Sequence, residues 1–469
     1  MKLIGRKDEI DILNNVLSST QSEMVAVYGR RRVGKTFLIR SCYKKELLFS
    51  ISGMHNATLN EQLINFSIAL KEAKKSRAKP IAPSSWIEAF EELKDFILSQ
   101  KTKTKKVLFF DELPWLDTPK SKFLQALDLF WNSWATNRND IVLVICGSAA
   151  SWMIKKILNN KGGLHNRVTR RIRLMPFTLH ETELFLKHKH IKLDRYSITQ
   201  LYMAIGGIPF YLNEVQIGKS VAQNIEQICF SKDGLLQTEF QNLYKALFNN
   251  SDKHVRVIKA LANAHKGLTR NDIIRKAKLN TGGSISILLN ELLESGFISE
   301  IKAQHNKLKN NIFRLTDEYS LFYIKFIEPN LPTTKSTWTR LSKGSVYFSW
   351  SGYAFENTCF KHSQEIKKAL GISGIHTNIF SWQSNEAQID MIIDRDDRVA
   401  TICEMKFYNT EFEISKAYYS TLQRKLQAYQ SDNKSNKNNF ITLITSFGLK
   451  HTNYSNAIID NVLTLDNLF

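Results

Sequence analysis

Short apolar runs mark the first third of the chain as a domain with buried strands. Residues 23–28 read Glu-Met-Val-Ala-Val-Tyr, residues 107–110 read Val-Leu-Phe-Phe, and residues 141–146 read Ile-Val-Leu-Val-Ile-Cys. Runs of this length with few polar residues are typical of strands buried in a parallel sheet. We therefore predict an α/β core over residues 1–177, with the three strands ending at one edge of the sheet.

The pattern changes to helical periodicity after this core. Residues 178–248 combine that periodicity with many charges, which predicts a helical lid. Residues 249–327 then hold three helical segments, with Thr269 as a cap for the second, followed by a strand, a basic segment from Lys302 to Lys309 and a returning strand. Three helices and a hairpin in that order predict a winged helix.

Two roles are open for the winged helix. In such a module the third helix enters the major groove of DNA and a basic wing contacts phosphates. The third helix of this chain is mostly apolar, however, and Glu291 and Glu294 on it would repel DNA. A role as an interaction or spacer module is therefore weighed equally.

The last third of the chain is predicted to be a second α/β domain. Two prolines and little periodicity indicate a linker over residues 328–344, and the domain follows at 345–469. Within it, residues 352–361 form a helix with an apolar stripe. Residues 387–394 and 399–407 form two strands joined by a turn at 395–398. The chain as a whole is thus predicted to be a multidomain α/β protein.

Charge and cysteine content narrow the partners and the compartment. The 65 Lys and Arg residues exceed the 44 Asp and Glu residues, which gives a net charge of +21 among 469 residues. A surplus of this size favours a nucleic acid as partner. The five cysteines form no CxxC pair, so no zinc site or disulfide framework is indicated. The chain shows no signal segment, and its longest nearly apolar run, 141–154, is too short to span a bilayer. We expect a cytoplasmic protein that does not enter membranes.

The loop after the first strand has the composition of a phosphate-binding loop. It consists of Gly29, Arg30, Arg31, Arg32, Val33, Gly34, Lys35 and Thr36, and Phe37 follows at the start of a helix. This fits GxxxxGK[ST] between a strand and a helix. Glycines let backbone N–H groups surround phosphate oxygens, and the helix N-terminus adds positive potential. Lys35 would reach the β- and γ-phosphates of ATP, and the Thr36 hydroxyl would bind Mg²⁺.

Acidic and hydroxyl residues follow the other two strands. Asp111 and Glu112 come directly after the run at 107–110, and Ser148 follows the run at 141–146. Asp111 would hold the Mg²⁺ shell and Glu112 would polarise the attacking water, which predicts hydrolysis rather than binding alone. Ser148 would sense the γ-phosphate or hold the water. A helix N-cap is an equally good interpretation of Ser148 and does not exclude that role.

These segments resemble the archaeal-type ATPases of the AAA+/STAND P-loop class. The resemblance rests on Leu3-Ile-Gly5-Arg6 with Glu9, GRRRVGKT, LFFDELPWL and ICGSAASWM, and it continues into Leu164-His-Asn-Arg167 and Gly206-Gly207-Ile-Pro209-Phe-Tyr-Leu. It implies that Arg167 stabilises charge at the phosphates and that the Gly206–Leu212 stretch belongs to the lid. Many members have a glycine where this chain has Asn166, and Arg170 and Arg171 compete with Arg167 for the role.

Charged residues on the strands of the C-terminal domain form a second candidate site. Asp390 lies on one strand, and Glu404 and Lys406 share a face of the next. Asp390 and Glu404 would converge on one or two Mg²⁺ ions, and Glu356 from the preceding helix could add a ligand. Lys406 would position the water or neutralise the developing charge of phosphodiester cleavage. The competing interpretation is a structural salt bridge between Glu404 and Lys406.

This second set of residues resembles the PD-(D/E)XK, restriction-endonuclease-like nucleases. It also resembles the C-terminal domain that accompanies the archaeal-type ATPases, so the two resemblances together cover nearly the whole chain. Ile389 stands where the proline of the family name would be. Gln423 and Lys425 on the following helix could be further active-site groups, but helical surface is the favoured interpretation of each.

The combined prediction is a Mg²⁺-dependent ATPase coupled to nucleic-acid binding, with DNA favoured over RNA and DNA cleavage left open. The alternative is a STAND-like switch, in which ATP gates a C-terminal domain that binds nucleic acid or protein without cutting. A third and weaker option, a motor that moves along DNA, would require a homo-oligomer and an arginine acting in trans.

Overall fold

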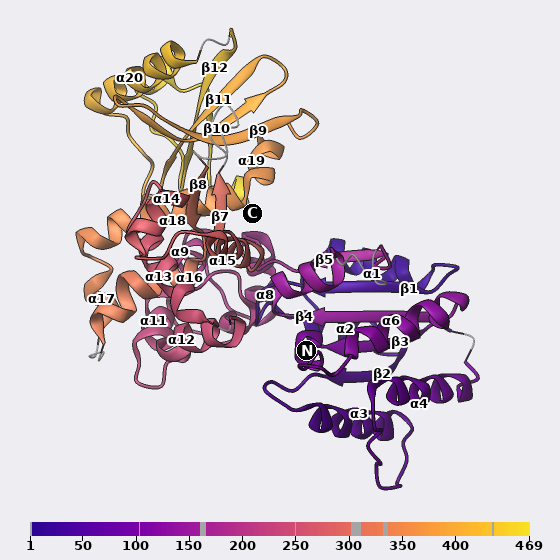
Figure 1. The fold of residues 1–469 in the computed structure, drawn as a ribbon. Coiled ribbons are helices and arrows are strands. Elements are labelled where there is room, and N and C mark those ends of the chain that lie inside the picture. Colours follow the sequence, from indigo (N-terminus) through magenta and orange to yellow (C-terminus); the bar gives the residue numbers. More distant parts are fainter. Residues whose placement is uncertain are drawn as a thin grey trace. The chain divides into compact units, whose positions relative to one another are not determined.

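The computed structural model describes residues 2–102, 104–159, 166–248, 250–301, 311–331, 336–433 and 436–469. The chain divides into two compact units, Met1–Pro176 and Phe177–Phe469 (Figure 1). The basic segment from Lys302 to Lys309 lies outside the described residues, as do Leu164 and His165. Within the described part of the chain, no helix is long and apolar enough to cross a membrane.

The first unit is built on a parallel five-stranded sheet with the order β2-β3-β4-β1-β5. Its strands are β1 (Glu23–Tyr28), β2 (Leu47–Ser52), β3 (Lys106–Asp111), β4 (Ile141–Gly147) and β5 (Arg170–Arg173). Its helices are α1 (Lys7–Leu17), α2 (Lys35–Cys42), α3 (Leu59–Ala73), α4 (Trp86–Ser99), α5 (Leu113–Leu116), α6 (Phe123–Ser133) and α7 (Ala150–Met153).

Both faces of this sheet are buried, which explains the nearly continuous apolar runs in its strands. Ala26 and Val27 are neighbours on β1 that point to opposite faces, and both are fully buried. One face carries an aromatic core contributed by α3, α4 and α6. In that core Phe90 stacks on Phe130 with ring centroids 5.1 Å apart.

The order of the strands in this sheet differs from their order along the chain. The acidic strand β3 does not lie beside β1, because β4 is inserted between them and pairs with both. Position along the chain does not set position in a parallel sheet, since each connection is a crossover that can pass over a neighbouring strand. The insertion places Ser148, which follows β4, between the loop after β1 and the two acids at the end of β3.

The second unit begins with helices in the region predicted to be a lid. They are α8 (Leu179–His188), α9 (Arg195–Ile205), α10 (Pro209–Leu212), α11 (Val221–Ile225) and α12 (Leu235–Leu247). Thr178 caps α8 with a capping box, and Asp194 caps α9 by accepting from the Ser197 N–H. Capping residues therefore fix where these two helices begin.

Three helices and a small antiparallel sheet follow. They are α13 (Ser251–Ala262), β6 (Leu268–Thr269), α14 (Arg270–Lys276), α15 (Gly283–Glu294), β7 (Ile298–Ile301) and β8 (Ile312–Leu315). The sheet has the order β6-β8-β7. Thr269 caps α14 as predicted, because its side chain accepts from the Asp272 N–H. Helix α16 (Glu318–Phe322) comes next.

The described part of the predicted linker packs against the lid helices. Residues 328–330 form a helical turn, and α17 (Thr337–Leu341) follows. The N–H groups of Thr337 and Trp338 donate to the Glu226 carboxylate, and the Trp338 ring is buried among aromatic rings. A buried tryptophan was missed at the sequence level because prolines and polar residues dominate this segment.

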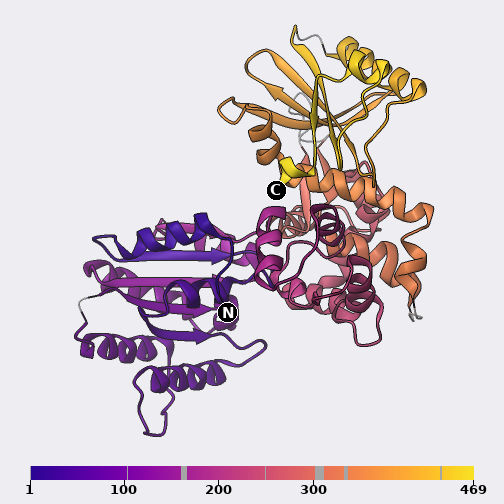
Figure 2. The same cartoon turned by 180° about the vertical axis from the view of Figure 1, so that it is seen from behind.

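The C-terminal part is a mixed sheet with the order β13-β12-β11-β10-β9. Strand β10 pairs antiparallel with both β9 and β11, and β11, β12 and β13 run parallel. The elements are α18 (Ser345–Lys361), α19 (Ser363–Ala369), β9 (Thr377–Gln383), β10 (Gln388–Arg395), β11 (Val399–Lys406), α20 (Lys416–Asp432), β12 (Asn438–Thr445), α21 (Asn453–Ile458) and β13 (Asn461–Leu463). Helix α20 covers one face of the sheet (Figures 1 and 2), where its Tyr429 packs in an apolar core with Trp382 and Ile402.

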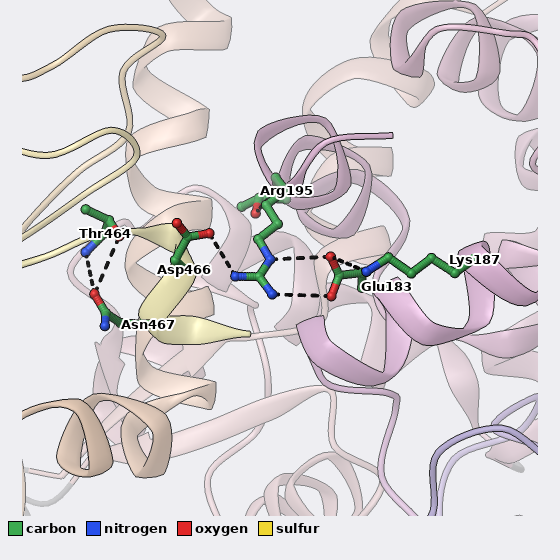
Figure 3. Close-up of polar contacts among 7 residues, drawn as sticks. Glu183, Lys187, Arg195, Thr464, Asp466 and Asn467 are labelled. Carbon is green, nitrogen blue, oxygen red and sulfur yellow. Dashed lines mark hydrogen bonds and ion pairs between the residues drawn. The ribbon is translucent and has the colours of Figure 1, made fainter. Parts of the chain in front are cut away.

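Helix α9 connects α8 to this C-terminal sheet through side-chain contacts. Arg195 forms ion pairs with Glu183 of α8 and with Asp466 near the chain end (Figure 3), the latter at 2.8 Å. The neighbouring Tyr196 ring stacks flat on Phe407, with centroids 4.8 Å apart and an interplanar angle of 5°. Phe407 follows Lys406 directly, so α9 packs beside the end of β11.

A close backbone approach in this unit makes a testable prediction. A Cβ added to Gly207 would lie 2.0 Å from the carbonyl oxygen of Phe177, and the Phe177 N–H donates to the Gly207 carbonyl. We expect Gly207→Ala to destabilise the second unit by roughly 1–3 kcal/mol, because backbone must move. Gly352→Ala on α18 is the matched control, since its Cβ would meet no atom within 4 Å. It should leave stability unchanged or raise it by about 1 kcal/mol. Thermal unfolding of both variants checks this prediction. Equal melting temperatures would contradict the close contact between Gly207 and the Phe177 backbone.

Candidate functional site

The predicted phosphate-binding loop connects β1 to α2 and depends on its glycines. Gly29 has a φ of +141° and Gly34 a φ of +93°, both in the region that favours glycine. A Cβ on Gly29 would also lie 2.4 Å from the carbonyl oxygen of Leu174. Gly34 is the N-cap of α2, so the free N–H groups of that helix face the loop. The loop is therefore shaped to bring backbone donors around an anion.

Two basic side chains hold this loop from inside. The Lys35 ammonium is only 6% exposed and donates to the carbonyl oxygens of Gly29 at 3.0 Å and Arg30 at 2.9 Å. Arg6 is also buried, and its guanidinium donates to the Val33 carbonyl at 3.2 Å. Lys35 thus lies under the loop, where a phosphate would draw its ammonium away from the two carbonyls.

The residues predicted to hold Mg²⁺ at this site are in direct contact. The Thr36 hydroxyl donates to the Asp111 carboxylate at 2.6 Å, across from α2 to the end of β3. A hydroxyl and a carboxylate side by side are the hard oxygen ligands that Mg²⁺ prefers. The donor set of this chain therefore fits that ion.

Glu112 and Ser148 also meet, in an arrangement that the sequence did not specify. The Glu112 carboxylate accepts from the Ser148 N–H at 3.0 Å and from its hydroxyl at 2.8 Å. Glu112 itself has a φ of +45°, a strained conformation for a residue with a side chain. The N-cap of α7 is Ala149, so Ser148 orients Glu112 rather than capping that helix.

The remaining predicted residues of this site differ in their exposure. Arg30 and Val33 are buried in the loop, Arg31 and Arg32 are half-buried, and Phe37 is exposed. Arg167 is exposed in a turn after the undescribed residues 160–165. Arg173 on β5 pairs with Tyr28 in the sheet register, directly before the loop, and sequence reasoning did not single it out.

The second predicted site lies on the C-terminal sheet. Glu404 on β11 is buried and makes two side-chain contacts with α20: the Tyr418 hydroxyl donates at 2.8 Å and the Lys425 ammonium at 2.5 Å. The Lys406 ammonium lies 5.0 Å from the centre of the Tyr418 ring. Glu404 therefore pairs with Lys425 and not with Lys406, which overturns two interpretations: the Glu404–Lys406 salt bridge, and Lys425 as helical surface.

Asp390 lies on the strand beside Glu404. The register of β10 and β11 pairs Met391 with Cys403, so Asp390 and Glu404 are opposite at the next position. Gln388 donates its amide to the Asp390 carboxylate at 2.7 Å. The two acids that the sequence placed on adjoining strands are therefore neighbours across the sheet.

Glu356 reaches the same site from α18. Its carboxylate accepts from Arg314 of β8 at 3.0 Å. Burial raises the pKa of the Glu356 carboxyl to about 7, the Asp390 carboxylate adds to the rise, and the Arg314 guanidinium opposes it. Arg314 is 4% exposed and lies between the rings of Tyr353 and Phe360 at 4.9 and 5.3 Å. No sequence signal connects Arg314 to Glu356, because 41 residues separate them and they lie in different predicted domains.

We call Glu356, Asp390, Glu404 and Lys406 the carboxylate–lysine cluster. Two of its members, Glu356 and Asp390, line a cleft of about 740 Å³. Its walls come from α18, α20, the turn between β9 and β10, and the turn before β6. The lining residues are His265, Lys266, Ser349, Gly352, Tyr353, Glu356, Gln383, Ser384, Asn385, Glu386, Ala387, Gln388, Asp390, Arg424 and Lys425.

The carboxylates of this cluster fit a hard cation by chemistry, but each is engaged elsewhere. Among the described residues, no three His, Cys, Asp or Glu side chains are grouped closely enough to hold a metal ion. Glu356 pairs with Arg314, and Glu404 pairs with Lys425. Metal binding would therefore require these ion pairs to open. Spacing offered a signal for Lys425, because it lies seven residues after Tyr418 and so on the same face of α20.

Comparison with known proteins shows what the first part of the chain is similar to. Residues 3–215 match the model of a family described as an ATPase domain predominantly from Archaea. Over 443 residues the chain is 25% identical to the uncharacterized protein MJECL04 of Methanocaldococcus jannaschii, covering 90% of this chain and 91% of that protein. The Walker-type ATPase PABY2304 of Pyrococcus abyssi is 16% identical with a TM-score of 0.50, covering 69% of this chain and 96% of its own. The ORC2 protein of Aeropyrum pernix is also 16% identical, with a TM-score of 0.43. The similarity covers 69% of this chain and 93% of the ORC2 chain.

The similarity to this family supports the prediction of a P-loop ATPase domain in this part of the chain. The likeness to the Pyrococcus abyssi structure supports the fold alone, because its sequence identity is low. The match ends at residue 215. The carboxylate–lysine cluster and the segments around it therefore lie outside it.

The environment of Glu356 predicts opposite effects of two substitutions on its pKa. In the absence of divalent cations its carboxyl should titrate near pH 7. Asp390→Asn should lower this pKa, because it removes a negative neighbour that disfavours ionisation. Arg314→Gln should raise it, because it removes the cation that favours ionisation. Infrared titration of protein labelled with ¹³C-glutamate, with the Glu356→Gln spectrum subtracted, measures the three values. Shifts of the same sign in both variants would contradict the arrangement.

Proposed function

We propose that this chain hydrolyses ATP at the edge of the parallel sheet and couples hydrolysis to DNA binding and cleavage at the carboxylate–lysine cluster. For ATP, the supporting observation is the pair of contacts Thr36–Asp111 and Glu112–Ser148 next to the loop that holds Lys35. For cleavage, it is the position of Glu356 and Asp390 on the wall of one cleft, with Glu404 on the strand that pairs with the strand of Asp390.

The residues of the nucleotide site divide the work of hydrolysis. Backbone N–H groups of the loop bind the phosphates, and Lys35 exchanges its two carbonyl acceptors for β- and γ-phosphate oxygens. Mg²⁺, held by Thr36 and Asp111, would neutralise charge on the phosphates. Glu112, oriented by Ser148, accepts a proton from the attacking water or polarises it. Arg167 remains a candidate for stabilising the charge of the transition state.

DNA is the favoured polyanion for the second unit. The objection that Glu291 would repel DNA weakens, because Glu291 is turned to His254 of α13 at 2.8 Å. The exposed positions of α15 include Ser286, Ile287 and Asn290, which carry no charge. A winged helix that binds DNA through this helix is compatible with that surface.

Cleavage would use residues from three elements around the cleft. Glu356, Asp390 and Glu404 would hold Mg²⁺, which would activate water and stabilise the leaving oxygen of a phosphodiester. Lys406, on the same strand face as Glu404, would bind the scissile phosphate or orient the water. The chain would need to release Arg314 and Lys425 from the carboxylates first.

Those two ion pairs are also the observation that favours the alternative function. A STAND-like switch with a C-terminal domain that only binds could keep Glu356 on Arg314 and Glu404 on Lys425 permanently. The paired carboxylates would then be structural, and the domain would recognise nucleic acid or protein without cutting.

The nucleotide site predicts a separation of binding from hydrolysis. Glu112→Gln should lower the rate of ATP hydrolysis by roughly 10²–10⁴-fold while ATP still binds, because the loop, Lys35 and Thr36 are unchanged. Glu72→Gln on α3 is a matched control and should hydrolyse ATP normally. Phosphate release and binding of a fluorescent ATP analogue measure the two quantities. An unchanged rate in Glu112→Gln would remove Glu112 from the mechanism.

The carboxylate–lysine cluster predicts cleavage that depends on Glu404. The purified chain is mixed with linear and circular DNA and with RNA, with Mg²⁺ or Mn²⁺, with and without ATP. We expect DNA to be cut by the unmodified chain and by Glu413→Gln, a control on the same domain, and not by Glu404→Gln. DNA binding without cleavage in every condition would contradict the nuclease proposal. The ATP-gated switch would then be the favoured function.

A further inference from the structure

The cleft over the carboxylate–lysine cluster is shared between two predicted domains. Its C-terminal walls come from α18, α20 and the turn between β9 and β10. Its remaining wall is the turn at 264–267, between α13 and β6, which contributes His265 and Lys266. This turn belongs to the predicted winged helix, although it is not the element that such modules place in a DNA groove.

The turn is fixed in place by its glycine. The Gly267 N–H donates to the Ala264 carbonyl at 2.8 Å, which closes the turn. Gly267 has a φ of +77°, and a Cβ there would lie 2.3 Å from the Ile312 side chain on β8. The turn therefore lies against β8, and its two side chains at 265 and 266 are exposed.

A chain of contacts connects this turn to the acid on α18. The His265 ring meets the Tyr353 ring edge-on, with centroids 5.0 Å apart. Tyr353 lies under the Arg314 guanidinium, which pairs with Glu356. The Tyr353 hydroxyl and the Asn357 amide both donate to the carbonyl of Leu315 at the end of β8. The wall at 264–267 and the helix that carries Glu356 are thus one packed assembly.

Two cations face the cleft without an ionic partner. Lys266 comes from the turn and Arg424 from α20, and neither forms an ion pair with any residue that the structure describes. Burial, together with the nearby Lys325 and Arg314, lowers the pKa of His265, so Lys266 supplies the positive charge of the turn. The cleft is therefore lined by three acids, Glu356, Glu386 and Asp390, and by two cations without an ionic partner among the described residues, which come from two different walls.

The turn between β9 and β10 adds uncharged hydrogen-bond donors and acceptors to the cleft. Gln383, Asn385 and Gln388 line the cleft together with Ser384. Amide side chains pair with the edges of bases, and single strands expose those edges fully. A volume of about 740 Å³ is that of a small-molecule pocket. It has room for a few nucleotides of one strand.

We infer that this cleft binds a single strand of nucleic acid, with Lys266 and Arg424 on its phosphates and the β9–β10 turn along its bases. The inference rests on the proposed function, because it places the strand over Glu356 and Asp390. It assigns the turn at 264–267 to the substrate site, so the winged helix contributes a wall of the cleft in addition to any groove contact.

The test measures binding without cleavage. The full chain with Glu404→Gln is titrated into a fluorescein-labelled 12-nucleotide single-stranded DNA at several salt concentrations, and anisotropy gives Kd. Three double variants are built on the Glu404→Gln chain and compared with it. Two carry Lys266→Gln or Arg424→Gln as the second substitution, and the third carries Lys276→Gln, on the exposed side of α14, as the control. The same titration of the unmodified chain in EDTA guards against an effect of Glu404→Gln itself, and circular dichroism checks folding.

We expect Lys266→Gln and Arg424→Gln each to raise Kd by about fivefold at low salt. Each should also reduce the slope of log K against log salt by about 0.7, because each removes one phosphate contact. Lys276→Gln should change neither quantity. Unlabelled single strand should compete more strongly than duplex or free ATP. Unchanged slopes in both cleft variants, or no binding at all, would overturn the inference. Equal competition by duplex would overturn its single-strand part, and stronger competition by ATP would make the ligand a free nucleotide.

The outcome for the cleft can be separated from the outcome for cleavage. If the unmodified chain cuts no nucleic acid but the cleft variants lose binding as expected, the cleft inference stands and the nuclease proposal fails. If DNA is cut and the cleft variants bind normally, the substrate follows another path to Glu404, and the inference fails alone.

Discussion

The buried guanidinium of Arg314 is the constraint around which the C-terminal part of the structure is arranged. A cation that is almost fully removed from water requires a carboxylate, hydrogen bonds and polarisable neighbours. Arg314 obtains them from Glu356 and from the rings of Tyr353 and Phe360, all on α18. Removing one partner of such a pair typically costs about 3–5 kcal/mol. The pair therefore fixes α18 against β8, and with it the position of the acid nearest to the cleft.

Both candidate sites keep their reactive groups occupied by internal partners. Lys35 donates to two loop carbonyls, Thr36 to Asp111, and Lys425 to Glu404. Unpaired buried charges would be costly, so these contacts stabilise the unliganded protein. Ligand binding is then an exchange of partners, and its net free energy is smaller than the sum of the new contacts. Such exchange also couples ligand binding to movement of the elements that supplied the old partners.

The sequence predicted the local chemistry well and the long-range contacts poorly. The loop at 29–36, the strand before it and the acids after β3 follow local rules of composition and spacing, and the structure has each of them. The insertion of β4 between β1 and β3 could not be predicted, because crossovers leave no local trace. Arg314 was missed for the same reason, since its role depends on a partner in another predicted domain. Lys425 was misjudged because a lysine on a polar helix is usually solvated, and only its contact with buried Glu404 distinguishes it.

The stacking of Tyr196 on Phe407 bears on how this chain can be divided. Helix α9 contributes Tyr196 and Arg195 to the C-terminal sheet, and β8 contributes Arg314 to α18. A fragment that began at residue 345 would expose the Phe407 ring beside Lys406 and would leave Glu356 without its cation. Phe177–Phe469 is a compact unit that contains all of these contacts. Transfer of the C-terminal sheet to another protein, in the laboratory or in evolution, would have to carry α9 and β8 with it.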